Sequence, residues 1–110
     1  MDLFWAVHGG QDPVQLMQRH PGRWALMHLK DMKPSTKDDP PGRAADYPLG
    51  SGRIDVVAAL REGIRQGTQH YFIEDESPQP LAQIAQSVRY LESLAWEAAR
   101  PAGDEKKPVR

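Results

Sequence analysis

Cysteine and long apolar runs are both missing from this sequence. The absence of cysteine excludes disulfide bonds and thiolate metal sites. No apolar stretch approaches the roughly 20 residues that span a bilayer, and the N-terminus lacks the basic-then-apolar pattern of a secretory signal. We therefore expect no membrane partner and a cytoplasmic location. An export signal upstream of this stretch would change that location.

An excess of one charge is also missing. The 14 basic and 15 acidic side chains leave a formal net charge of −1. Nothing here predicts the basic surface that nucleic acid or an anionic membrane requires. The 110 residues suffice for one modest domain, and 39% hydrophobic with 26% charged residues is typical of a globular chain.

A short apolar run that ends at a histidine is the central feature of the chain. Residues 24–29 read Trp-Ala-Leu-Met-His-Leu, a pattern typical of a parallel-sheet strand buried on both faces. Alternation places His28 on the same face as Trp24 and Leu26. His28 then lies at the carboxyl end of the strand, where α/β folds bind ligands. The plainer interpretation is a histidine that caps a strand with one hydrogen bond.

Helix signals appear in three segments of the chain. A capping aspartate, a proline in the first turn and a glycine after the last turn are typical helix limits. Apolar residues recur at helical spacing in the second and third segments, which predicts that they are buried. The expected limits are Asp12 to Pro21, Asp55 to Gly67, and about Pro80 to Ala95. The expected buried stripes are Val57, Leu60 and Ile64, and then Leu81, Ile84, Val88, Leu91 and Ala95.

A second strand and one long polar segment complete the pattern. Residues 70–76 alternate so that Phe72 and Glu74 share one face, with Glu74 at the carboxyl end. Residues 1–7 are interpreted as the end of a strand and the loop after it. Residues 33–48 lack an apolar period and predict a loop, either a lid or binding loop or a plain surface insertion. The succession predicts a right-handed parallel α/β fold.

Three potential metal ligands follow successive strands at their carboxyl ends. They are Asp2, His28 and Glu74. One carboxylate or imidazole from each of three neighbouring strands suits a divalent cation such as Mn²⁺, Mg²⁺, Co²⁺ or Zn²⁺. Acidic residues are also frequent in loops after strands, so solvated carboxylates are the alternative. The metal shell would need at least one further ligand.

Four motifs in order between residues 2 and 94 carry a family resemblance. They are Asp-Leu-Phe-Trp with Gly-Gly-x-Asp-Pro, Met-His-Leu-Lys-Asp-Met, Gly-Ser-Gly-Arg-Ile-Asp, and His-Tyr-Phe-Ile-Glu-Asp-Glu. Together they resemble the sugar phosphate isomerase/epimerase family, which has the xylose isomerase-like (β/α)8 TIM barrel. The resemblance implies that residues 1–96 are parallel β/α units from the C-terminal third of such a barrel. The composition of residues 97–110 predicts a disordered charged tail.

The length of the chain then suggests a partial barrel. A full barrel needs eight strands and about 250 residues, so we interpret this sequence as part of a longer enzyme. An open piece would expose strand edges and barrel-facing side chains, and we expect it to be poorly stable and inactive alone. A homo-oligomer is one arrangement open to the full-length protein.

The resemblance also implies site residues and chemistry. Asp2, His28 and Glu74 would be three of four metal ligands, and the fourth, a Glu from an earlier strand, has no counterpart here. The reaction would be proton transfer next to a carbonyl of a sugar or polyol, with the metal stabilising the enediolate. Glu74 is the expected catalytic acid–base; a purely structural ligand is its plainer role.

Two departures from the family pattern affect the predicted substrate contacts. Trp5 stands where these epimerases usually carry a substrate-binding histidine, and it is interpreted as an apolar wall for a sugar or as a core aromatic. The arginine expected shortly after the metal histidine is absent. Lys30 and Arg53 are alternative anion contacts, although basic residues at such places are often only solvated.

Three other functions have features in common with this sequence. A lyase or dehydratase of cyclic polyols on the same barrel would use nearly the same ligands. Apurinic-site endonucleases share the barrel, but the net charge and the single well-placed histidine disfavour them. A non-catalytic fragment that binds a partner through its exposed sheet edge would be indifferent to divalent metal.

Overall fold

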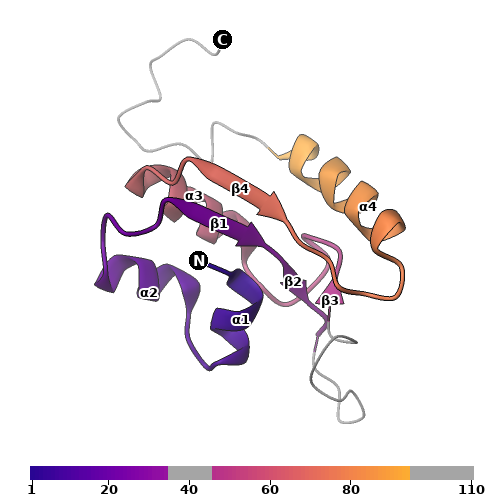
Figure 1. Cartoon of the computed structure of the whole chain (residues 1–110), viewed down its shortest axis with the longest axis horizontal. Coiled ribbons are helices and arrows are strands. Elements are labelled where there is room, and N and C mark those ends of the chain that lie inside the picture. The colour runs from indigo at the N-terminus through magenta and orange to yellow at the C-terminus, as the bar shows by residue number, and fades with distance from the viewer. Residues whose placement is uncertain (35–45, 95–110) are drawn as a thin grey trace.

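The computed structural model describes residues 1–34 and 46–94 as a mixed α/β structure (Figure 1). Figure 1 shows α3 behind the pair β1 and β4, with α1 and α2 on the β1 side and α4 on the β4 side. Within these two ranges, no helix combines the length and apolarity needed to cross a bilayer. The elements are α1 (Leu3–His8), α2 (Pro13–Arg19), β1 (Leu26–Leu29), β2 (Asp31–Met32), β3 (Asp46–Tyr47), α3 (Val56–Gln66), β4 (His70–Ile73) and α4 (Pro80–Ser93).

The parallel pair β1 and β4 is the centre of the fold. The register aligns Leu26 with His70 and His28 with Phe72. Asp2 extends the pair on the other side of β1, because it forms a parallel bridge with His28. The strand end predicted for residues 1–7 is therefore limited to the first two residues, and the predicted loop is wrong because helix α1 begins at once.

Asp2 explains this early helix start. Its carboxylate accepts a hydrogen bond from the Trp5 N–H at 2.9 Å, which caps α1. The expected caps of the next two helices are confirmed. Asp12 accepts the Gln15 N–H and begins α2. Gly67 ends α3 at a φ of 88°, a conformation that glycine adopts without strain.

Only one face of β1 is buried, so the prediction of burial on both faces is wrong. Met27 and Leu29 are buried, whereas His28 is exposed and Leu26 is 50% exposed. The helices bring their apolar residues to the first face, and nothing in the described ranges fully covers the second. The buried hydrophobic core is formed by Leu3, Phe4, Met17, Met27, Leu29, Met32, Leu49, Ile54, Val56, Ala59 and Leu60.

The two predicted helix stripes are only partly correct. In α3, Leu60 is buried as expected, but Val56 and Ala59 join it in place of Val57 and Ile64. The helix is therefore rotated towards the core by a fraction of a turn relative to the predicted stripe. Gly63 of α3 lies so close to Met27 that a Cβ there would stand 2.8 Å from Cε of Met27.

Helix α4 differs more from its prediction. Leu81 is 86% exposed and Val88 is 38% exposed, and Ser87 is the buried residue. The Ser87 hydroxyl accepts the Leu49 N–H at 3.0 Å, and the Tyr90 ring lies so close to Gly50 that a side chain there would collide with it. The helix packs on the turn after β3, so Leu81 and Val88 of the predicted stripe are exposed, whereas Ile84 and Leu91 are half-buried and Leu91 packs against the core. Ala95 lies outside the described residues.

Two short antiparallel strands, β2 and β3, flank the segment that was predicted as a loop. Asp31 and Met32 of β2 pair antiparallel with Asp46 and Tyr47 of β3. The loop predicted over 33–48 therefore ends earlier, at β3, because β2 provides a strand edge for pairing. Residues 35–45 and the predicted tail 97–110 lie outside the described residues.

The buried carboxylate of Asp31 organises the turn that precedes α3. Its two oxygens accept backbone N–H groups of Met32 at 2.7 Å, Gly50 at 3.0 Å, Gly52 at 3.0 Å and Ile54 at 3.1 Å. A Cβ at Gly52 would stand 2.3 Å from an oxygen of Asp31. The Gly-Ser-Gly motif thus allows the backbone to wrap around this carboxylate.

Candidate metal centre

Three side chains converge at the carboxyl edge of the parallel strands. Asp2 bridges to β1, His28 belongs to β1, and Glu74 follows β4 directly. Because His28 is aligned with Phe72, alternation returns Glu74 to the same face two residues later. The Glu74 N–H also donates to the Leu29 carbonyl at 3.2 Å and continues the strand pairing. We call Asp2, His28 and Glu74 the strand-end triad.

The geometry of the strand-end triad suits a small cation. The Nδ1 atom of His28 lies 2.8 Å from Oε2 of Glu74 and 3.2 Å from Oδ2 of Asp2. One ligand atom from each residue lies within 4.8 Å of the other two. In the part of the chain that the structure describes, no other His, Asp and Glu set meets this criterion.

The donor set and its exposure also fit a divalent metal. One imidazole and two carboxylates are ligands that Mn²⁺, Co²⁺ and Zn²⁺ accept, and carboxylates suit Mg²⁺. The side chains are between 19% and 46% exposed, so a cation and a substrate could reach them from solvent. Three ligands from the protein leave coordination positions for a further ligand, water or substrate.

Trp5 lies one helical turn after Asp2. Its side chain is 47% exposed, so it is not a core aromatic. The ring makes an edge-to-face contact with His8, with 5.2 Å between the ring centroids. The role of Trp5 as an apolar wall for a substrate stays a prediction, and its exposure leaves the ring available for that contact.

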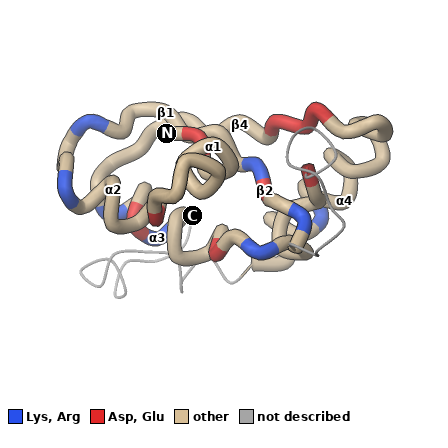
Figure 2. Tube along the Cα trace, turned by 90° about the horizontal axis from the view of Figure 1, so that it is seen from below, with Lys and Arg blue, Asp and Glu red and all other residues tan. Residues whose placement is uncertain are grey.

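Lys30 has a different environment from the solvated or substrate-facing cation that the sequence suggested. Its side chain is 2% exposed. Its ammonium group lies 2.9 Å from Oε1 of Glu76 and 3.7 Å from Oδ2 of Asp46. Figure 2 shows acidic residues grouped where β4 ends. We call Lys30, Asp46 and Glu76 the Lys30 cluster; substrate contact by Lys30 stays a prediction.

The charges of the Lys30 cluster shift two pKa values. Burial works to lower the pKa of Lys30, but the hydrogen bond to Glu76 and the charge of Asp46 outweigh it, and the pKa is raised. Burial raises the pKa of Asp46, although the hydrogen bond from the Glu76 N–H and the charge of Lys30 oppose this shift. The ammonium group thus stays protonated despite its burial.

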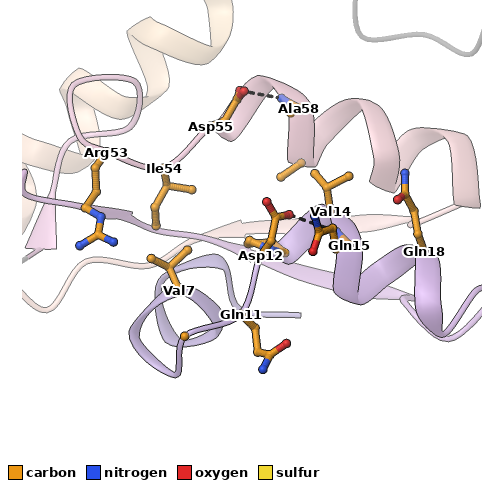
Figure 3. A pocket seen from close by; sticks show the side chains of 13 residues that line it. Val7, Gln11, Asp12, Val14, Gln15, Gln18, Arg53, Ile54, Asp55 and Ala58 are labelled. Atoms are coloured by element: carbon orange, nitrogen blue, oxygen red, sulfur yellow. Dashed lines mark hydrogen bonds between the residues drawn. The ribbon is translucent and has the colours of Figure 1, made fainter.

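Arg53 lies apart from the strand-end triad. It lines a cleft of about 760 Å³ between the α1–α2 connection and the start of α3, which none of the triad residues lines. Figure 3 shows Arg53 and Gln18 at opposite ends of this lining. The structure therefore does not bring Arg53 together with the triad, and its contact with a substrate stays a prediction.

Sequence reasoning missed three residues beside the site. Phe72 is 49% exposed and meets His28 edge to face, with 6.1 Å between the ring centroids. The alternation of residues 70–76 is a signal that places Phe72 on the face of Glu74, but sequence reasoning did not assign it to the site. Asp46 and Glu76 had no such signal, because their partner Lys30 is distant in the sequence, 46 residues from Glu76.

The comparisons with known proteins agree with the fold. No family model and no curated protein matches the chain. A solved sugar phosphate isomerase/epimerase from Parabacteroides distasonis ATCC 8503 is similar, with 27% identity and a TM-score of 0.67 over 87% of this chain and 31% of that chain. A second from the same organism has 25% identity and a TM-score of 0.68, over 86% and 30%. The chain thus spans about a third of their length.

Proposed function

We propose that this chain forms part of a metal-dependent sugar phosphate isomerase/epimerase, as the C-terminal third of a xylose isomerase-like (β/α)8 barrel. The observation that carries the proposal is the convergence of the strand-end triad at the carboxyl edge of parallel strands. Ligands gather at that edge in barrels of this kind. Both similar structures are isomerase/epimerases, which supports the same class of enzyme.

The proposed chemistry is proton transfer next to a carbonyl group. A divalent cation at the triad would supply Lewis acidity where negative charge develops on the substrate. Glu74 accepts and returns the proton as general base and acid. His28 and Asp2 would be the other two metal ligands from this chain. The remaining ligand would come from another part of the barrel. Glu74 as a purely structural ligand is the simpler alternative.

The proposed substrate is a sugar or polyol that enters on the exposed side of the triad. Trp5 would contact its apolar face. A lyase or dehydratase of cyclic polyols would use the same groups and differs only in losing water after proton abstraction. A cytoplasmic location and a homo-oligomeric full-length protein belong to this proposal as predictions.

Thermal melting with and without Mn²⁺ tests the metal site. The variants are His28→Ala and, as matched control, His70→Ala, an exposed histidine on the adjacent strand and outside the triad. We expect Mn²⁺ to raise the Tm of the 110-residue chain and of His70→Ala but not of His28→Ala. If melting is not cooperative, the loss of the free Mn²⁺ EPR signal reports binding instead. Equal responses of all three proteins would refute the site.

A second candidate function is favoured by the open face of the strand pair. Leu26 and Phe72 are about half exposed there, and β4 has a single strand neighbour among the described residues. Exposed apolar side chains beside a free strand edge are typical of a surface that binds another polypeptide. Such a binding fragment would show no Mn²⁺ response in any of the three proteins above.

A further inference from the structure

An ion cluster with a buried centre at Lys30 and Asp46 lies next to the strand-end triad. Lys30 reaches it from the end of β1, Asp46 from β3, and Glu76 from the segment after β4. The Glu76 N–H also donates to Oδ2 of Asp46 at 2.7 Å. One ammonium group therefore connects three segments that are distant in the sequence.

The Lys30 cluster and the strand-end triad each contain one ion pair between the same two segments, residues 28–30 and residues 74–76. His28 pairs with Glu74, and two residues further along both segments Lys30 pairs with Glu76. In an extended chain, residues two apart point to the same side. The position of Glu74 is thus set by its own contact with His28 and by the contact that holds Glu76.

The charge of Lys30 also offsets a concentration of carboxylates. Asp46 and Glu76 both lie within 4.0 Å of its ammonium nitrogen, and Glu74 is close enough to interact with its charge. The other oxygen of Asp46 is buried without a hydrogen-bond partner among the described residues. Without the ammonium group, the repulsion between these carboxylates would push Glu74 and Glu76 away from their present places.

The same ammonium group contacts the ring next to the site. It lies 5.3 Å from the centroid of Trp5 and 4.8 Å from the centroid of Phe4. A cation over an aromatic face is attracted to the ring. The orientation of Trp5, the proposed apolar wall, therefore depends on the same side chain that holds Glu76.

We infer that Lys30 is a positioning residue of the metal centre, which fixes the ligand Glu74 and the Trp5 ring through its contacts with Glu76, Asp46 and the indole. The inference rests on the proposed function for its metal readout. Lys30 itself contacts neither the cation nor the substrate in this role. It acts through Glu74, as the groups behind metal ligands commonly do.

Four variants of the 110-residue chain test the inference. Lys30→Met removes the charge and keeps the length of the side chain. Lys30→Arg keeps the charge. Glu76→Gln weakens the ion pair with Lys30 at a side chain that is 38% exposed. The matched control is Glu62→Gln, since Glu62 is a buried carboxylate that pairs with Arg65 and lies outside the triad and the Lys30 cluster.

Two readouts separate positioning from plain stability. The first is Co²⁺ binding, followed by its visible absorption, which reports the ligand geometry. The second is the NMR signals of the His28 ring without metal, which report its contact with Glu74. We expect Lys30→Met to weaken Co²⁺ binding about 10-fold or more and to shift the ring signals. Glu76→Gln should do the same to a smaller extent, whereas Lys30→Arg and Glu62→Gln should resemble the wild type.

Each other outcome has a defined meaning. If Lys30→Met and Glu76→Gln keep the wild-type Co²⁺ spectrum and ring signals, the inference is wrong and the cluster only stabilises the fold. If Lys30→Met does not fold, Glu76→Gln decides by the same two readouts. If the wild type binds no Co²⁺ but the ring signals still shift in Lys30→Met and Glu76→Gln and not in Lys30→Arg or Glu62→Gln, the proposed function fails and the positioning role stands.

Discussion

His28 in β1 and Asp31 in β2 are only three residues apart, yet they have opposite environments. The nitrogen Nδ1 of His28 is shared between two carboxylates, and the imidazole is 46% exposed. The Asp31 carboxylate is fully buried and accepts four backbone N–H groups. A polar group whose hydrogen bonds are all made within the fold holds structure together. One that faces other ligand atoms in solvent is available for binding.

The largest expected effect is that of Asp31→Asn. The side-chain amide would turn a donor towards backbone donors, so a buried charged hydrogen-bond network would be broken. We expect a loss of about 3 kcal/mol or more in the free energy of unfolding. Urea denaturation followed by circular dichroism measures it, and a chain that is unfolded without urea counts as the same result.

The control for this change is Asp55→Asn. Asp55 is exposed and caps α3 through the Ala58 N–H at 3.0 Å. Asparagine caps a helix about as well as aspartate, so its effect should stay within about 0.5 kcal/mol. Equal urea midpoints for the two variants would show that Asp31 is not the structural centre of the turn.

A smaller effect is expected at Asp2, whose carboxylate makes one structural contact and one contact in the candidate metal site. Its Oδ1 caps α1 and its Oδ2 faces His28. Asp2→Asn should retain the cap but lose most of the Mn²⁺-induced rise in Tm, because a neutral amide replaces a charged ligand. Asp2→Ala should lose that rise and also about 1 kcal/mol of stability. Melting with and without Mn²⁺ measures both, and an unchanged metal response in Asp2→Asn would remove Asp2 from the site.

The smallest effect concerns Glu62, a buried carboxylate away from the strand edge. The hydrogen bond from Arg65 lowers the pKa of Glu62 below its usual 4.5, and burial opposes this shift. A lowered pKa contributes stability that is present above the unfolded-state value and is lost as the pH falls through the folded-state value. The urea midpoint of the wild type should therefore fall more steeply below pH 4.5 than that of Glu62→Gln. Parallel pH profiles would contradict this assignment.

The element types and the triad were within reach of sequence analysis. The caps at Asp12 and Asp55 and the glycine at residue 67 depend on local backbone chemistry, and each is where it was predicted. The grouping of His28 with Glu74 depends on alternation from two recognisable strands. The helical state of residues 3–8 was missed, because α1 is short and its capping aspartate is the second residue of the chain.

The sequence by itself determined α2, α3, α4, β1 and β4 and which residues stand at the ends of those strands, because capping and periodicity act over a few residues. The tertiary structure decided which face of β1 is buried, which side of α4 contacts the fold, and how Lys30 and Asp31 find their partners. The contacts of Lys30 with Asp46 and Glu76 join residues 16 and 46 positions apart, and that of Asp31 with Gly50 joins residues 19 apart. Periodicity places an ionisable side chain on a face, but only the assembled fold supplies the carboxylates or amides that make its burial favourable.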